Sequence, residues 1–173
     1  MIHYVSGILA QIGNDFAVVD CGGVGFKLGI SISTASKIAP NAGKKVLLYS
    51  YMAVSEDNIS LYGFAEEDEL NLFIRLISVS GIGPKAGMSI LGTLSPDDLR
   101  SAVANGDAKT IATAPGVGLK TAQKLIIELK DKIGAGVAAE MPVQSNENNE
   151  KILFNRRNET HEKICLYGYG SRY

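Results

Sequence analysis

Two copies of one short glycine pattern constrain the fold of this chain more than any other feature. The first copy spans residues 79–86 and the second spans residues 114–122, and their leading glycines, Gly81 and Gly116, lie 35 positions apart. A Gly-x-Gly turn permits positive φ and lets the main chain approach a ligand closely. The next helix begins with unpaired N–H groups and the positive end of its dipole, so each copy predicts a backbone site for an anionic oxygen.

Apolar periodicity predicts that each glycine turn joins two helices. The positions that share one helix face are Leu70, Phe73, Ile74 and Ile77 before the first turn, and Ala122, Leu125, Ile126, Leu129 and Ile133 after the second. Faces with this spacing are expected to be core. A helix, a glycine hairpin and a second helix, twice over, is the helix-hairpin-helix arrangement, which binds nucleic-acid backbone without reading bases. Lys85 and Lys120, just inside the second helices, would add positive charge.

The glycines have three other interpretations. Residues 81–86 fit the spacing of a dinucleotide fingerprint, but that motif needs a preceding strand and a later acidic residue, and here a helix is predicted instead. Residues 116–121 are similar to the end of a Walker loop, but Leu119 interrupts the required order. The plainest interpretation, that both turns are only tight connections between helices, stays open, although the duplication disfavours it.

Length and composition limit the remaining possibilities. The chain of 173 residues can hold one ordinary domain or two small ones. It has no apolar run of membrane-spanning length, and residues 1–5 lack the features of a secretory signal, so a cytoplasmic location is expected. Cys21 and Cys165 are too few for a disulfide framework or zinc cluster. His3 and His161 are the only histidines, so no catalytic triad, metal site or cofactor is predicted.

Charge is unevenly distributed along the chain. The formal net charge of −1 argues at first against a nucleic-acid ligand. However, residues 71–132 carry eight Lys or Arg and five acids, a net charge of +3, whereas residues 50–70 carry six acids and no base. The sequence therefore predicts opposite electrostatic fields in separate regions, with the positive field on the helical part.

The N-terminal third of the chain has a β pattern. Its apolar or alternating runs are residues 2–10, 16–21, 24–32, 46–52 and 59–64. Residues 33–40, between the third and fourth runs, suit a helical turn, as in a five-stranded barrel of the OB type. The predicted fold class is α+β with several domains: an OB-fold barrel in residues 1–64, then an all-α tandem helix-hairpin-helix domain in residues 65–133.

The end of the chain has a different composition. Residues 134–150 begin with Gly134-Ala135-Gly136 and end with a stretch, residues 142–150, rich in Gln, Ser, Asn and Glu, and together they predict a flexible linker. Residues 151–173 hold one short apolar cluster without helical period, and they predict a mostly disordered tail.

Glu56 and Asp57 stand side by side between the fourth and fifth predicted strands. Adjacent carboxylates can hold magnesium, but such sites usually draw ligands from several elements. A solvated turn is therefore the favoured interpretation from the residues alone.

The tract 52–64, followed by both helix-hairpin-helix copies, resembles the RuvA family, the DNA-binding subunits of the bacterial Holliday-junction branch-migration machinery. Residues 22–25 and 125–131 also resemble that family, and the likeness covers residues 1 to about 135. The resemblance implies a non-catalytic homotetramer, or two tetramers, that holds a four-way junction open in recombination and DNA repair. It also implies a partner, the hexameric AAA+ motor RuvB, that supplies the energy of ATP.

The resemblance gives roles to particular residues. Glu56 and Asp57 would form an acidic pin that repels phosphates at the crossover. Both hairpins and Lys124 would hold DNA backbone. The complete predicted DNA-binding set is Gly81, Ile82, Gly83, Pro84, Lys85, Gly116, Val117, Gly118, Leu119, Lys120, Thr121 and Lys124. Leu119 and Ser55 stand where the family often has basic residues.

The end of the chain departs from the family pattern. Family members carry a third helical domain that engages the motor, and residues 146–173 are too short and aperiodic to supply an ordinary one. We therefore expect an atypical, truncated or frame-shifted C-terminus, and coupling to the motor stays open. Two other functions also stay open: a general helix-hairpin-helix binder of duplex DNA, and a dinucleotide-binding enzyme.

Overall fold

The computed structural model describes residues 2–56 and 58–136, without the side chains of residues 131–136. The chain up to Ala135 forms one compact unit. The described residues do not include Asp57, most of the predicted linker or the predicted tail. The prediction of an atypical C-terminus therefore also concerns residues outside the described ones. None of the described helices has the length and apolar content that a membrane crossing requires.

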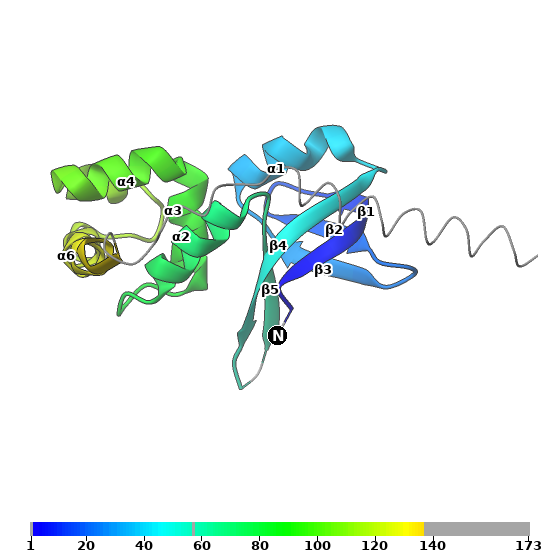
Figure 1. The fold of residues 1–173 in the computed structure, drawn as a ribbon, viewed down its shortest axis with the longest axis horizontal. Helices are drawn as coiled ribbons and strands as arrows, with labels where there is room; N and C mark the ends of the chain where they lie inside the picture. Colours follow the sequence, from blue (N-terminus) through cyan, green and yellow to red (C-terminus); the bar gives the residue numbers. More distant parts are fainter. Residues whose placement is uncertain (1, 57, 137–173) are drawn as a thin grey trace, which may run out of the picture. The chain divides into compact units, whose positions relative to one another are not determined.

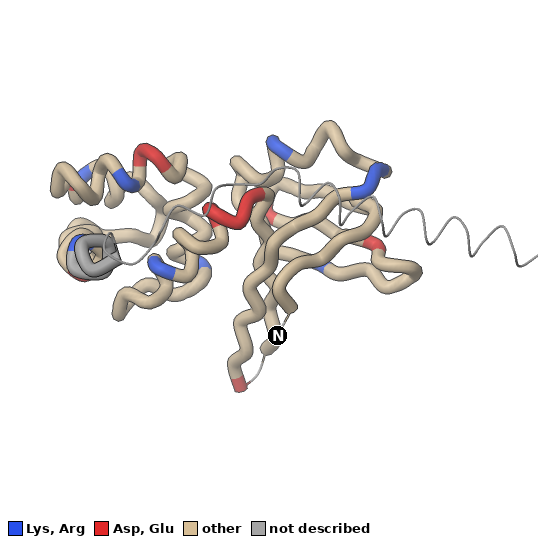
Figure 2. Tube along the Cα trace, viewed as in Figure 1, with Lys and Arg blue, Asp and Glu red and all other residues tan. Residues whose placement is uncertain are grey.

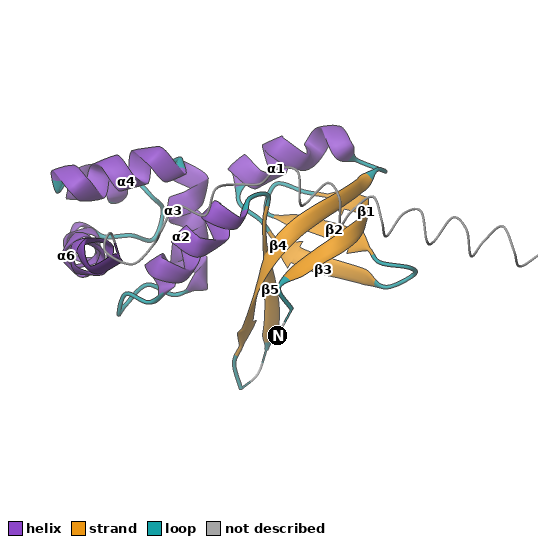
Figure 3. Cartoon of the chain, in the orientation of Figure 1, coloured by secondary structure: helices purple, strands orange, loops and turns teal. Residues whose placement is uncertain are grey.

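Five strands close into a barrel in the order β1-β2-β3-β5-β4 (Figures 1 and 3). The strands are β1 (Tyr4–Ile12), β2 (Phe16–Asp20), β3 (Gly25–Gly29), β4 (Lys45–Val54) and β5 (Ile59–Phe64). Neighbours are antiparallel except β3 and β5, which pair in parallel. A helix, α1 (Ile32–Ile38), and a 3-10 turn (Ala39–Asn41) join β3 to β4. These elements confirm the predicted five-stranded barrel with a helical connection.

Alternation along the strands fills the barrel. The inward-facing strand residues that are buried in this cluster are Val5, Leu9, Ala17, Val19, Leu28, Val46 and Leu48. Their immediate neighbours in the same strands lie on the outer face, as the two-residue period of a strand requires. Among these outward residues, Tyr4, Ile8 and Leu47 are apolar and exposed.

Five helices follow the barrel. They are α2 (Glu67–Ile77), α3 (Pro84–Thr93), α4 (Pro96–Asn105), α5 (Ala108–Ile111) and α6 (Leu119–Gly136). Gly134 and Gly136 therefore continue α6, which runs past the predicted end of the helical domain at residue 133. A glycine costs about 1 kcal/mol relative to alanine inside a helix but does not by itself end one.

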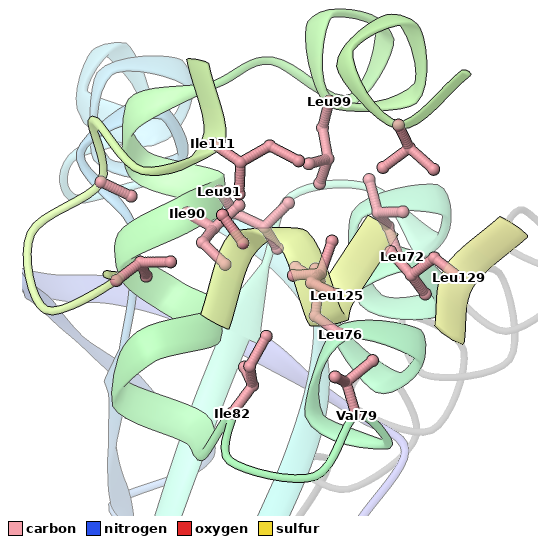
Figure 4. Close-up of a cluster of buried hydrophobic side chains, with 14 of the residues drawn as sticks. Leu72, Leu76, Val79, Ile82, Ile90, Leu91, Leu99, Ile111, Leu125 and Leu129 are labelled. Atoms are coloured by element: carbon pink, nitrogen blue, oxygen red, sulfur yellow. The ribbon is translucent and has the colours of Figure 1, made fainter. Parts of the chain in front are cut away.

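The helices share one apolar core. Figure 4 shows leucine and isoleucine side chains from α2 to α6 converging on it, together with Val79 and Ile82 from the first glycine turn. Ala122, Leu125, Ile126 and Leu129 are buried as predicted. The side chain of Ile133 lies outside the described residues.

The predicted core face of α2 is wrong at one position. Ile74 is 39% exposed, whereas Leu72 and Leu76 are buried together with Leu70 and Phe73. The reason is that α2 is covered on two sides. Its Phe73 ring lies against Phe64 of the barrel at a centroid distance of 4.9 Å, and α3 and α4 also pack against α2. Helical periodicity alone predicts a single buried face, so it misplaces residues at the edge of that face when a helix packs against two surfaces.

The acids at the start of α2 are paired within the fold. Figure 2 shows this acidic stretch. The Lys37 ammonium of α1 donates to Glu69 (2.7 Å) and Glu66 (2.9 Å), and Arg100 of α4 donates to both carboxylate oxygens of Asp68 (2.5 and 2.6 Å). The negative field predicted over residues 50–70 is therefore reduced at these three acids, because two cations distant in sequence, Lys37 and Arg100, pair with them.

Candidate nucleic-acid interface

The first glycine turn lies between α2 and α3 and is built from main-chain hydrogen bonds. The Ile82 N–H donates to the Val79 carbonyl (3.0 Å), and the Gly87 N–H donates to the Gly83 carbonyl (3.0 Å). Val79 and Ile82 are buried, so the loop is anchored in the core while Gly81 and Gly83 stay exposed.

The second turn, between α5 and α6, repeats this pattern 35 positions on. The Val117 N–H donates to the Ala114 carbonyl (3.1 Å), and the Ala122 N–H donates to the Gly118 carbonyl (2.9 Å). Ala114 and Val117 are buried and Gly118 is exposed. The duplicated sequence pattern thus corresponds to a duplicated backbone structure.

Only the first glycine of each pair needs the left-handed region. Gly81 has φ 94° and Gly116 has φ 80°, whereas Gly83 has φ −88°. A Cβ atom added at any of these three positions, or at Gly118, would meet no heavy atom within 4 Å. The absence of side chains leaves open space above the turns, as a site for close backbone approach requires.

The two turns offer different sets of backbone donors. The first-turn N–H groups of a helix have no acceptor within the helix. Pro84 supplies no N–H at the start of α3, whereas Leu119 supplies one at the start of α6. The second site therefore has one more amide donor than the first, and the helix dipole favours an anion at both.

The predicted contact residues fall into two groups. Ile82 and Val117 are buried, so they could reach a ligand only through their main chains. Lys85 and Lys120 are exposed, and neither forms an ion pair with another described residue. Lys124 lies 3.7 Å from Glu128 in an exposed pair, an interaction worth about 0–1 kcal/mol. Such a pair would exchange readily for a phosphate contact.

The helix that leads into the second turn is capped firmly. The Asp107 carboxylate accepts hydrogen bonds from the backbone N–H groups of Lys109 and Thr110 (both 3.1 Å) and from the Thr110 hydroxyl (2.6 Å). These bonds, those of Thr110 foremost, hold the pKa of Asp107 below its usual value. The cap fixes the start of α5, only four residues long, and so the approach to the second turn.

Glu56 lies near the tip of the hairpin between β4 and β5, which extends beyond the barrel in Figure 1. The Ser55 N–H and hydroxyl both donate to the Asn58 carbonyl (2.8 and 3.0 Å). Val54 and Ile59, paired across the ribbon, are 66% and 69% exposed. Glu56 is also exposed, and no cluster of His, Cys, Asp or Glu suited to a metal ion occurs within the described ranges.

Because α2 precedes the first turn, the strand required by a dinucleotide fingerprint is missing there, and the dinucleotide interpretation is not supported.

Nothing in the sequence indicated a role for Ser89 of α3, whose hydroxyl donates to the Pro115 carbonyl in the second turn (2.8 Å). A serine inside a helix gives no sign of such a distant partner.

A small β-barrel followed by a duplicated helix-hairpin-helix unit is the architecture of a protein that binds the sugar-phosphate backbone of nucleic acid. Comparison with known families agrees with it. Residues 1–63 match the RuvA N terminal domain, and residues 73–131 match the SAM-like Helix-hairpin-helix tandem. The chain belongs to the RuvA family.

Curated relatives support this membership over most of the chain. The relative from Thermoanaerobacter sp. (strain X514) is 44% identical over 154 residues, which cover 88% of this chain and 82% of the relative. That from Lachnospira eligens is 41% identical over 177 residues, covering 99% and 85%. That from Acetivibrio thermocellus is 49% identical over 133 residues, covering 77% and 65%. Each is named Holliday junction branch migration complex subunit RuvA.

Proposed function

We propose that this protein recognises four-way DNA junctions by their shape and holds them open for branch migration in recombination and DNA repair. The observation that carries the proposal is the repeated glycine turn, with open space above its glycines and unpaired amides at the start of the next helix. The names of the relatives supply the class of DNA.

The two turns would grip the sugar-phosphate backbone of each arm from the minor-groove side. Backbone amides would hold phosphate oxygens, and Lys85, Lys120 and Lys124 would add charge around them. None of these groups reads a base edge, so binding would be independent of sequence. It would weaken steeply as salt rises, because bound phosphates release counterions.

The hairpin with Glu56 and Asp57 would act as an acidic pin. Two carboxylates near the crossover would repel phosphates that come close. A continuous duplex would carry phosphates into this region, whereas a junction with a central opening would not. Shape preference would then arise from a penalty against the wrong ligand.

A homotetramer with fourfold symmetry would match the four arms and bring four pins together. Its support on this chain is the outer barrel face, where Tyr4 and Ile8 of β1 lie beside Leu47 of β4, the cross-strand partner of Ser6. Exposed apolar side chains grouped on one surface mark an interaction site. A second tetramer could close over the other side of the DNA.

The energy for moving the junction would come from a separate hexameric AAA+ motor, RuvB. The chain would be a non-catalytic, cytoplasmic platform for that motor. Its relatives are named as subunits of a branch migration complex, which supports a motor partner. In the family a third helical domain engages the motor. The residues where it would lie, 146–173, are outside those that the structure describes, so coupling to the motor stays open.

A competition gel shift with four-way and linear DNA of the same arm sequence, repeated across a salt series, tests the proposal. We expect marked preference for the four-way form and a linear fall of log affinity with log salt. Equal affinity for both forms would favour the second candidate, a general duplex binder, which the glycine turns alone would also support. Retention of neither DNA would reject both functions.

A further inference from the structure

One hydrogen bond crosses from the first helix-hairpin-helix copy to the second. Ser89 lies on α3, the second helix of the first copy, and its Oγ donates to the carbonyl of Pro115, the residue before Gly116 (2.8 Å). At the matching position on α6, 35 residues on, stands Lys124, whose ammonium pairs with Glu128 instead. The two copies are therefore coupled by a hydrogen bond that the repeat itself does not require.

The position of this hydrogen bond matters because Pro115 and Gly116 share a peptide group. The described peptide bonds are all trans. In a trans peptide the carbonyl and the N–H point in opposite directions. When the Pro115 carbonyl points at α3, the Gly116 N–H must point away from α3. That N–H makes no hydrogen bond to another described residue, and the space above Gly116 is open.

We propose that Ser89 is a positioning residue for DNA binding: by holding the Pro115 carbonyl it aims the Gly116 N–H at the phosphate site of the second turn. The inference rests on the proposed function. Gly116 has φ 80° and carries no side chain, so its flanking peptides rotate more easily than those of other residues. A hydrogen bond that holds one of them reduces the ordering cost when a phosphate binds.

Serine suits this task because a single rotatable bond, χ1, separates its hydroxyl oxygen from a rigid helix backbone. Ser89 is half-buried, and the next residue on the same helix, Ile90, is fully buried. The hydroxyl donor is thus held by α3, the helix whose N-terminus forms part of the first phosphate site. Through Ser89, the orientation of the second site depends on the helix of the first.

The test compares three single variants in the full-length protein with the wild type. Ser89→Ala removes the donor, and Ser89→Thr keeps a hydroxyl at the same place. Ser36→Ala is the matched control, because Ser36 of α1 also donates to a backbone carbonyl, that of Ile32 (3.0 Å), but far from the turns in sequence. Affinity for a four-way junction is measured by gel shift across a salt series.

We expect Ser89→Ala to weaken binding about two- to tenfold, the net effect of one hydrogen bond. The salt slope should stay unchanged, because the variant keeps every charge and every group that binds phosphate. Ser89→Thr should restore wild-type affinity, and Ser36→Ala should leave it unaltered.

A spectroscopic readout separates positioning from a merely structural role. In protein labelled with 15N-glycine, the Gly116 amide resonance should move in Ser89→Ala and respond less to titration with a short DNA duplex. The Gly81 amide, in the copy without this hydrogen bond, should respond as in the wild type. If Ser89→Ala binds as the wild type does and Gly116 responds normally, the inference is overturned. If the wild type itself retains no DNA, the proposed function fails instead.

Discussion

Leu119 shows how one residue can set the strength of a phosphate site. It is the first residue of α6, it is exposed, and it leaves an amide at the second turn where Pro84 leaves none at the first. Its side chain adds no charge. The second site is therefore richer in amide donors than the first but gains no cation at this position.

We predict that Leu119→Lys strengthens binding to both four-way and linear DNA and steepens the salt slope by about 0.9, the value for one more phosphate neutralised. The matched control is Ile127→Lys, which adds the same charge at another exposed position of α6. Fluorescence anisotropy across a salt series measures both. Equal gains from the two variants would show that net charge, not the turn, is responsible.

Lys85 and Lys120 allow the opposite test at the residue scale. We predict that replacing both with alanine lowers affinity for every DNA sequence and flattens the salt slope by about 2, or about 1 for each lysine that no longer neutralises a phosphate. Lys44→Ala, a lysine change on an exposed barrel loop, serves as the control. A weakening confined to certain base sequences would contradict backbone recognition.

At the scale of elements, α2 is held to its neighbours by ion pairs. Glu69 is only 3% exposed, yet it accepts from the Lys37 ammonium (2.7 Å) and from the Thr34 hydroxyl (3.3 Å). A buried carboxylate is stable only when it is paired in this way. The pair therefore fastens α2, the helix before the first turn, to α1 of the barrel.

We predict that Lys37→Met lowers the free energy of unfolding by about 2 kcal/mol, because it leaves the Glu69 carboxylate without its cation. Glu66→Gln removes only the exposed partner of Lys37 and should cost about 0.5 kcal/mol or less. Urea unfolding at neutral pH measures both. Equal destabilisation by the two variants would mean that burial of Glu69 does not govern the pair.

The same pair predicts a response to alkaline pH. Hydrogen bonding to Glu69, foremost, raises the pKa of Lys37 above the usual lysine value of about 10.5. Since the folded state binds this proton more tightly, the stabilisation is complete below about pH 10.5 and is lost as pH rises through the folded-state pKa. Wild type should lose this increment in urea unfolding at alkaline pH, and Lys37→Met should not.

The hairpin between β4 and β5 is the second element with a testable role. We predict that Glu56→Gln combined with Asp57→Asn strengthens binding to linear duplex, because the repulsion of phosphates is removed, and so reduces the preference for four-way DNA. The control is Glu67→Gln, at an exposed acid of α2. Unchanged duplex affinity in the double variant, measured by gel shift, would remove the proposed role of the pin.

At the scale of the whole molecule, the outer barrel face bears on assembly. We predict that Ile8→Glu, at an exposed position of β1, leaves the barrel folded but shifts the proposed tetramer towards monomer. Light scattering gives the mass, and circular dichroism confirms folding. Ser36→Glu, at an exposed position of α1, is the control. A tetramer that persists would assign assembly to another surface.

Much of the architecture was predictable because its signals are local. Strand alternation, turn glycines and helix periodicity depend on neighbours within a few residues, so the five strands, the helical connection and the two glycine turns agree with the predictions. The proposed roles of the turns and of Glu56 also follow from residue type and position, and they stay predictions until DNA binding is measured.

Tertiary structure decided what depends on partners distant in the chain. Packing on two sides of α2 left Ile74 exposed. Lys37 and Arg100 form ion pairs with three acids of the stretch for which the sequence predicted a negative field. Ser89 and Pro115 likewise meet only in the folded chain. The amino-acid sequence by itself determined which segments turn and which faces are apolar. Pairings between side chains were decided by how the elements pack, because a charge or hydroxyl interacts with whatever folding brings within about 3 Å.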